Sequence, residues 1–322
     1  IVKLVLLKML YFNSTNGLIP HDNTLYLLER LSCGTGLFAS NGDIIYLVPN
    51  TEHSTSLSII TEFLHLQTNV FISAFNVTES SFENGYYNTI TLKLLQSNES
   101  TENLKAFTNL CLAHSSYMKG QEFIGFFDSL VSLFQLPREK YYKNLIGLMG
   151  ELLFIEYIQN TYGVDLSTYW HTEGSSSRFD FVCPFANFEV KTTSNNSLLF
   201  TIKHEQLFDS NTNNYLIAVV ISESNTGRTP ENLISDMLTN PDYCNSLQFS
   251  VNIEKEKRRI SPSELCNKHF VLKKVYAYNA KEINQFKTIP DCIEDLSYKL
   301  NLLPFCNVDF TDIIPSLRNK KQ

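Results

Sequence analysis

The sequence predicts an α/β fold of the mixed, α+β kind, in which helices flank a mixed β-sheet and a β-rich domain comes first. The chain has 322 residues, 43% of them hydrophobic, which suits about two domains with a sizeable core. Strand-like apolar runs dominate the first hundred residues. From residue 140 onward the expected order is helix, three strands, helix and strand, which is typical of an α/β core.

The first domain is expected at residues 1–100 and is dominated by strands. Apolar residues at helical spacing predict helices in residues 1–12 and 24–32. Runs rich in β-branched and aromatic residues predict strands, at 43–49, 56–64 and 69–76. The polar segment 77–102 predicts a surface connection that contains one strand near 88–95.

The second domain is expected at residues 101–322. Helical patterns cover 103–117, 121–136 and 140–160, and Gly163 is expected to help end the last helix. A β-hairpin follows at 178–193. The remaining expected elements are, in chain order, a strand at 198–203, a short helix at 204–208, a strand at 215–222, a helix at 230–239, a polar basic stretch, a strand at 269–278 and a helical tail.

The hairpin reads RFDFVCPFANFEVKTT, and charged residues interrupt both of its apolar strands. A turn of two or four residues within the Pro-Phe-Ala-Asn stretch is expected to place Asp180 opposite Lys191, and Val182 opposite Glu189. Because side chains alternate along a strand, Asp180, Glu189 and Lys191 would then share one face. A three-residue turn would instead flip Asp180 to the other face.

The charged face of this hairpin predicts a site for a divalent cation. Diagonal neighbours such as Asp180 and Glu189 have Cβ atoms within roughly 7–8 Å, and their charges repel unless a cation neutralises them. Mg2+ prefers such carboxylates together with phosphate oxygens, and Lys191 would lie beside it. Lys191 is the only lysine with an acidic residue two positions before it. The alternative is a solvated face with an ion pair between Asp180 and Lys191.

Glu151 is a second candidate site residue. It is the only charged or hydrogen-bonding side chain in LIGLMGELLFI, residues 145–155. A helix that is apolar on nearly all sides is buried, and an unpaired buried carboxylate costs several kcal/mol. Glu151 is therefore expected to have a partner. The partner could be a metal or its water, a buried ion pair, or backbone N–H groups.

These motifs together resemble the PD-(D/E)XK nuclease superfamily, whose core has a helix bearing Glu and a hairpin bearing Asp and (Asp/Glu)-x-Lys. The matching segments are GLMGELLF, RFDF, FEVKTTS and EQLF, within about residues 140–225. They are similar, more narrowly, to a family of PD-(D/E)XK proteins often encoded beside DNA methyltransferases and ATPases in bacterial restriction or phage-defence operons. One departure is Phe179, where the superfamily motif has Pro.

The resemblance implies metal-dependent cleavage of DNA with Mg2+, for which Mn2+ can substitute. It implies that Asp180, Glu189 and the Val190 carbonyl bind the metal, that Glu151 binds a second metal or supports its waters, and that Lys191 orients the water or stabilises the transition state. The expected function is a Mg2+-dependent DNA endonuclease in a restriction or anti-phage system. The alternatives are a catalytically weak DNA-binding or assembly subunit, and a nuclease for RNA or branched DNA.

Further residues are candidates for contact with nucleic acid. Arg178 precedes the hairpin strand, whereas Thr192 and Gln206 lie at positions where such families place auxiliary polar groups. A local excess of positive charge between residues 251 and 274 could contact phosphates, and a solvated loop explains it equally well. Its candidate residues are Lys255, Lys257, Arg258 and Arg259.

Charge and cysteine content limit the other classes of function. The net charge of −7 and the pI of about 5.6 count against a general nucleic-acid coat, although a local basic groove is compatible with them. The 7 cysteines form no CxxC pair, which excludes a zinc ribbon and favours a reducing, cytoplasmic compartment. No membrane association is expected, because the apolar N-terminus is too short to span a bilayer. No nucleotide-binding motif occurs, so ATP hydrolysis would require a partner, and cutting both strands makes a homodimer plausible.

Overall fold

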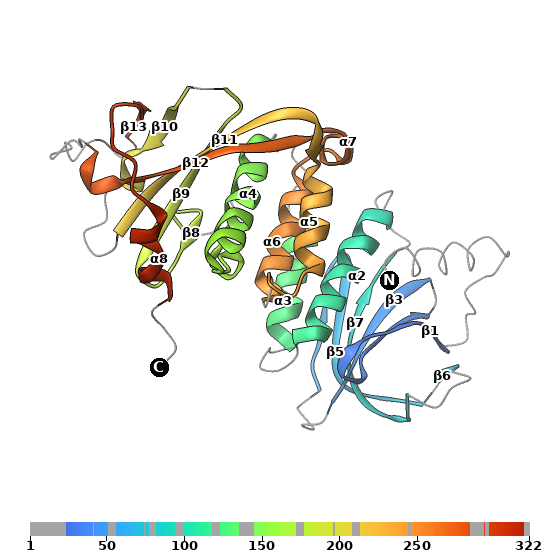
Figure 1. Ribbon diagram of the computed structural model, residues 1–322. Coiled ribbons are helices and arrows are strands. Elements are labelled where there is room, and N and C mark those ends of the chain that lie inside the picture. The colour runs from blue at the N-terminus through green and yellow to red at the C-terminus, as the bar shows by residue number, and fades with distance from the viewer. Residues whose placement is uncertain are drawn as a thin grey trace. The chain divides into compact units, whose positions relative to one another are not determined.

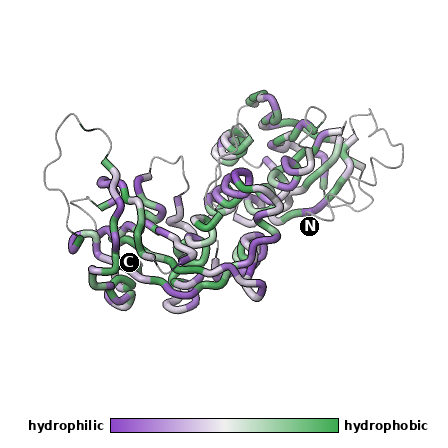
Figure 2. The backbone as a smooth tube through the Cα atoms, turned by 90° about the horizontal axis from the view of Figure 1, so that it is seen from above, coloured by the Kyte–Doolittle hydropathy of each residue, from purple (hydrophilic) through white to green (hydrophobic). Residues whose placement is uncertain are grey.

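The computed structural model describes residues 24–40, 42–50, 56–73, 75–76, 82–94, 100–117, 123–134, 145–171, 177–195, 197–207, 213–243, 246–283, 293 and 296–318. The chain forms two compact units, Ile1–Pro137 and Arg138–Gln322 (Figure 1). The expected domain boundary at residue 100 places the helices predicted at 103–117 and 121–136 in the second domain. The two compact units divide after residue 137, so both helices belong to the first unit. Each unit is mixed in hydropathy, with hydrophobic and hydrophilic stretches alternating along the chain (Figure 2).

The first unit is built on a seven-stranded sheet with the order β4-β5-β7-β3-β2-β1-β6. All of its pairings are antiparallel except that of β1 with β6. Its elements are β1 (Leu25–Arg30), η1 (Ser32–Gly34), β2 (Gly36–Ser40), β3 (Asp43–Pro49), β4 (Ser58–Ile60), β5 (Leu64–Ile72), β6 (Phe75–Asn76), β7 (Gly85–Leu92), α2 (Ser100–Tyr117) and α3 (Phe123–Phe134). The predicted β-rich N-terminal region is thus confirmed. The helix expected at 1–12 lies outside the described residues.

The helix expected at residues 24–32 is wrong, because this segment contains strand β1. Leu25 and Leu28 are both buried, and their spacing of three imitates one face of a helix. The structure explains this spacing by an irregularity in the pairing of β1 with β2 between Leu27 and Glu29. An irregularity of this kind interrupts the strict alternation of buried and exposed side chains.

The second unit contains a mixed four-stranded sheet with the order β12-β11-β9-β8. The sequence predicted that this sheet would be mixed. Strands β9 and β11 are parallel, and the other two pairs are antiparallel. Strands β10 and β13 form a separate antiparallel pair. The elements are α4 (Leu145–Tyr162), η2 (Ser167–Tyr169), β8 (Phe181–Val182), β9 (Ala186–Thr193), β10 (Leu199–Lys203), η3 (His204–Gln206), β11 (Asn213–Arg228), α5 (Pro230–Thr239), α6 (Leu247–Arg258), α7 (Pro262–Asn267), β12 (Phe270–Asn279), η4 (Ala280–Glu282), β13 (Ser297–Asn301) and α8 (Phe310–Arg318).

Helices α6 and α7 occupy the segment that the sequence predicted as a polar, basic connection. The hydroxyl of Ser246 caps α6 by accepting from the Phe249 N–H at 3.2 Å. Basic residues gather in the last turn of α6, where they complement the helix dipole. The run EKEKRR obscures this helix in the sequence, because it resembles a solvated loop by composition.

The two faces of the mixed sheet are covered by different elements. On one face, the Phe154 ring of α4 packs against Phe181 and Phe188 with ring centroids 5.6 and 5.7 Å apart. On the other face, Leu216 and Ala218 of β11 belong to a buried cluster with residues of β10, η4 and their neighbouring turns. The chain leaves α4 at Gly163, which has a φ of +66° and whose N–H donates to the Gln159 carbonyl at 2.8 Å, as predicted for a helix end.

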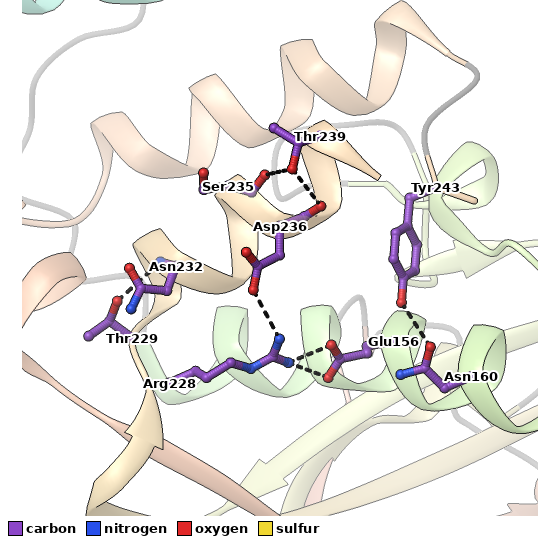
Figure 3. A network of polar contacts seen from close by, with 9 residues as sticks. All are labelled: Glu156, Asn160, Arg228, Thr229, Asn232, Ser235, Asp236, Thr239 and Tyr243. Carbon is purple, nitrogen blue, oxygen red and sulfur yellow. Dashed lines mark hydrogen bonds and ion pairs between the residues drawn. The ribbon is translucent and has the colours of Figure 1, made fainter. Parts of the chain in front are cut away.

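Arg228, at the end of β11, ties α4 to α5 (Figure 3). Its guanidinium donates to both carboxylate oxygens of Glu156 and, at 3.3 Å, to Asp236. The neighbouring Tyr243 hydroxyl donates to Asn160 on the same side of α4 at 3.4 Å. These contacts fix the position of α4 relative to the sheet. Within the described part of the chain, no helix has the length and apolarity needed to cross a bilayer.

Replacing Arg228 by Lys is expected to lower the free energy of unfolding by about 0.2–1 kcal/mol, because a single ammonium cannot replace a guanidinium that contacts Glu156 through one nitrogen and Asp236 through the other. Urea denaturation followed by circular dichroism measures the change. Asp236→Asn is the matched control and should cost less, since the Asp236 side chain is 64% exposed. Equal losses for the two variants would contradict the assignment of the stabilisation to the Glu156 pair.

Candidate metal centre

The hairpin that carries the charged residues closes through the two-residue turn Pro184–Phe185. The Cys183 N–H donates to the Ala186 carbonyl at 2.9 Å across this turn. Beyond it, Val182 pairs with Asn187. The predicted register differs from this one by two residues and is therefore wrong. The error arises because the sequence analysis placed the centre of the turn one residue too far toward the C-terminus.

The corrected register changes the partners of the charged residues without changing their faces. Val182 does not face Glu189, and Asp180 does not face Lys191. A shift by an even number of residues preserves the alternation of side chains, so the predicted grouping survives. Asp180 lies against the middle of β9, where its Oδ2 accepts a hydrogen bond from the Val190 N–H at 2.7 Å.

Glu189 is the centre of a buried polar cluster on β9. Its side chain is 4% exposed, and its Oε1 accepts from the Lys191 ammonium at 2.6 Å and from Gln206 Nε2 at 2.7 Å. The Lys203 N–H fixes the other end of the Gln206 amide by donating to its Oε1 at 3.0 Å. Burial of Glu189 and its pairing with Lys191 exclude the alternative of a solvated face with an ion pair between Asp180 and Lys191.

Glu151 reaches the same cluster from α4. It is 5% exposed, and its Oε2 accepts a hydrogen bond from the indole Nε1 of Trp170 at 2.7 Å. Sequence reasoning missed Trp170, although a signal was present: it is the only tryptophan of the chain. A buried tryptophan usually finds an acceptor for its N–H, and a buried carboxylate needs a donor. The Trp170 indole and the Glu151 carboxylate therefore satisfy each other.

Close packing of α4 on β9 brings Glu151 to the hairpin. A Cβ atom at Gly150 would lie 1.8 Å from Thr192 Oγ1, so only glycine permits this approach. The Thr192 hydroxyl lies in this interface, buried and without a hydrogen-bond partner among the described residues. The structure places the Thr192 hydroxyl against Gly150 of α4, and the contact of Thr192 with nucleic acid stays a prediction.

An excess of negative charge is the main electrostatic feature of the cluster. Burial raises the pKa of Asp180 well above its ordinary value, and the carboxylates of Glu151 and Glu189 raise it further. Burial also raises the pKa of Glu189, against the lowering effect of Lys191. One lysine is thus placed among three buried or half-buried carboxylates. Oxygen donors with excess negative charge fit a hard divalent cation such as Mg2+.

The carboxylates are not preassembled into a metal cage. Within the described ranges, no group of three His, Cys, Asp or Glu side chains has the geometry to hold a metal ion. Each acidic side chain is instead turned toward its own donor: Glu151 to Trp170, Asp180 to Val190, and Glu189 to Lys191 and Gln206. Small rotations of these side chains would be needed for them to share a cation.

The raised pKa of Asp180 predicts a pH-dependent stability of the metal-free protein. A carboxyl group with a raised folded-state pKa stabilises the fold fully below its unfolded value of about 4, and this contribution is lost as the pH rises through the folded value. Asp180→Asn cannot ionise. In EDTA, its free energy of unfolding should therefore exceed that of the wild type at neutral pH, and the difference should shrink toward acid. Urea midpoints from about pH 4 to about pH 8 measure this, and a difference independent of pH would contradict it.

The residues predicted to contact nucleic acid lie in three places. Arg178 is exposed beside the hairpin, and Gln206 is engaged with Glu189. The basic residues Lys255, Lys257, Arg258 and Arg259 lie at the end of α6. There, Lys257 pairs with Glu231 and Arg259 with Glu256, each at 3.3 Å. Two of these four basic residues are thus engaged in ion pairs with acidic residues of α5 and α6.

Comparison with known proteins identifies a family for this chain. Residues 51–249 match the family model described as "Putative PD-(D/E)XK family member, (DUF4420)". The match includes Glu151, Asp180, Glu189, Lys191 and Gln206. No curated protein and no solved structure matches the chain significantly. Since the family model covers more than half of the sequence and the mixed fold agrees with it, the chain belongs to this PD-(D/E)XK family.

Proposed function

We propose that the chain is a Mg2+-dependent endonuclease that hydrolyses phosphodiester bonds of DNA, with Mn2+ able to replace Mg2+. The observation that carries the proposal is the convergence of Glu151, Asp180 and Glu189 beside one lysine, in surroundings that raise the pKa of Asp180 and Glu189. A site built only for stability gains nothing from such repulsion. Enzymes of this superfamily typically use divalent metals.

Asp180, Glu189 and the Val190 carbonyl would hold the cation, with Glu151 at a second cation or its waters. When bound, a divalent cation supplies Lewis-acid polarisation of the scissile phosphate. Hydrogen bonds already restrain two of these carboxylates: Asp180 by the Val190 N–H and Glu151 by Trp170. These restraints lower the entropy that must be lost when the groups converge on a cation and substrate.

Lys191 is placed to act on the phosphate or on the attacking water. Its ammonium is 2.6 Å from Glu189 Oε1 and has two further N–H groups, and its side chain is 24% exposed. It can therefore donate to a phosphoryl oxygen on which negative charge increases in the transition state. Gln206 donates to the same Glu189 oxygen and so limits the rotation of that carboxylate.

The proposed setting is a bacterial restriction or anti-phage defence system, with a methyltransferase and an ATPase or helicase as operon partners. This part of the proposal derives from the resemblance of the motifs to the operon-encoded family. A homodimer would place two such centres on the two strands of a duplex. The basic end of α6 and Arg178 are the proposed contacts to the DNA backbone.

Incubation of the purified chain with methylated and unmethylated plasmid tests the proposal, with Mg2+ or with EDTA, and with and without the operon partners. Nicked or linear plasmid should form only in the presence of the divalent cation. Undiminished cleavage in EDTA would contradict the metal mechanism. DNA binding without cleavage under every condition would favour a catalytically weak assembly subunit, and cleavage confined to RNA or branched DNA would change the substrate.

A further inference from the structure

The short segment Trp170–His171 contacts two acidic residues of the candidate metal centre at once. The Trp170 indole donates to Glu151 Oε2 at 2.7 Å, and the His171 N–H donates to the Asp180 carbonyl at 2.7 Å. Trp170 also forms an isolated antiparallel bridge with Phe181. A single piece of chain therefore connects the acidic residue of α4 to the acidic residue of the hairpin.

Helix α6 holds this segment from its other side. The Asn252 amide donates to the Trp170 carbonyl at 2.8 Å, and the Phe249 ring packs against the indole with centroids 5.6 Å apart. Trp170 is 1% exposed and Asn252 is 4% exposed. The indole is thus fixed in position by its ring contacts and its own main chain, independently of the carboxylate to which it donates.

An indole is well suited to orient a carboxylate. It has one N–H donor and no acceptor, it carries no charge, and its orientation depends on two side-chain torsions only. A donor of this kind binds one carboxylate oxygen and thereby fixes the direction in which the other oxygen points. Groups that orient metal-binding side chains in this way typically contribute a factor of about 10–100 to metal affinity.

We propose that Trp170 is a positioning residue for Glu151, which it orients for a divalent cation, and that α6 supports it through Asn252 and Phe249. The inference rests on the proposed function, because that function supplies the metal. The hydrogen bond between Trp170 and Glu151 is independent of it. It assigns a role in the metal centre to a helix that lies about 50 residues beyond the hairpin in the sequence.

The first test measures Mn2+ binding by isothermal titration calorimetry on the full chain without DNA. Trp170→Phe keeps an aromatic ring and removes the N–H, and is expected to weaken Mn2+ binding about 10–100-fold. Phe154→Leu is the matched control, since it also removes part of a buried ring, whose recognised ring contacts are with Phe181, Phe188 and Phe310. It should bind Mn2+ like the wild type, even where it unfolds at a lower temperature.

The second test uses the fluorescence of Trp170 itself, excited at a wavelength that the 16 tyrosines do not absorb, because the chain has no other tryptophan. Glu151→Gln replaces the charged acceptor by a neutral one and should shift the emission maximum of the folded protein. Lys273→Gln, at an exposed position of β12, should leave it unchanged. This readout needs no metal and no substitution of Trp170. An unshifted spectrum in Glu151→Gln would overturn the inference.

A third measurement separates positioning from stability. Nicking of plasmid by Trp170→Phe should recover when the Mn2+ concentration is raised, whereas Glu151→Gln should not recover. Wild-type Mn2+ affinity in a folded Trp170→Phe protein would overturn the inference and leave the proposed nuclease intact. Failure of the wild type to bind Mn2+ would overturn both. Asn252→Ala, which keeps the indole, should weaken Mn2+ binding by a smaller factor, and an unchanged affinity would remove α6 from the proposal.

Discussion

Asp180→Asn and Lys191→Met are each expected to reduce Mg2+-dependent plasmid nicking by at least about 100-fold while the protein remains folded. Loss of a positioned charge at a reaction centre typically costs about 10²–10³ in rate. The physical reason differs between the two variants. Asp180→Asn removes a proposed metal-binding charge, whereas Lys191→Met removes the ammonium that is paired with Glu189. Initial rates of nicking measure both, with circular dichroism to verify folding.

Controls for these variants follow from the same structure. Lys273→Met removes an exposed lysine of β12, and Asp242→Asn removes an exposed acid, so each has the same change of charge as its partner variant. Both controls should nick plasmid at the wild-type rate. Retention of more than about a tenth of the wild-type rate by either site variant would exclude that residue from the catalytic machinery. Asp180→Asn has a further signature, since Mg2+ should raise the melting temperature of the wild type but not of this variant.

Gly150→Ala adds one methyl group at the site and is expected to lower the free energy of unfolding strongly. The new Cβ would lie 1.8 Å from Thr192 Oγ1 and 2.7 Å from both its Cβ and its Cγ2. Threonine is branched at Cβ, so rotation about χ1 cannot move all three atoms away. Helix α4 must therefore move off β9, at a cost of about 1–3 kcal/mol in the free energy of unfolding.

The same substitution should also lower activity, because Glu151 directly follows Gly150 and would move with the helix. A double-mutant cycle identifies the contact. Thr192→Ala removes Oγ1 and Cγ2, so the pair Gly150→Ala and Thr192→Ala should recover part of the lost stability, with a coupling of about 0.5–3 kcal/mol. Gly125→Ala is the control, because a Cβ there meets nothing within 4 Å. Additive losses for Gly150 and Thr192 would show that the clash is not the cause.

The grouping of the charged residues could be predicted from the sequence because it depends on local rules. Alternation along a strand places Glu189 and Lys191 on one face whatever their neighbours are, and one carboxylate in an apolar helix marks Glu151. The exact pairing of Asp180 could not be predicted. Turns of the same length but different position preserve the faces and change the partners, and the Pro-Phe-Ala-Asn stretch allows more than one position.

Contacts between distant segments could not be read from the sequence. Trp170 approaches Glu151 only after α4 has packed on the sheet, and Asn252 approaches Trp170 only once α6 is in place. Helix α6 itself was hidden by its charged composition. The contact of Thr192 with α4 was hidden for a related reason: a polar side chain after the Lys suggests a role at the site, whereas its hydroxyl lies on the face of β9 that α4 covers.

The hydrogen bond from the Val190 N–H to Asp180 has a consequence for local dynamics. Strand β8 pairs with β9 only at Phe181 and Val182, so the carboxylate of Asp180 takes the place that a carbonyl of a longer β8 would occupy. The amide proton of Val190 is therefore protected from exchange with solvent by a side chain rather than by a strand. If Asp180 turns toward a cation, this proton is released. The exchange rate of a single backbone amide would then report, without any substrate, whether the carboxylate has turned.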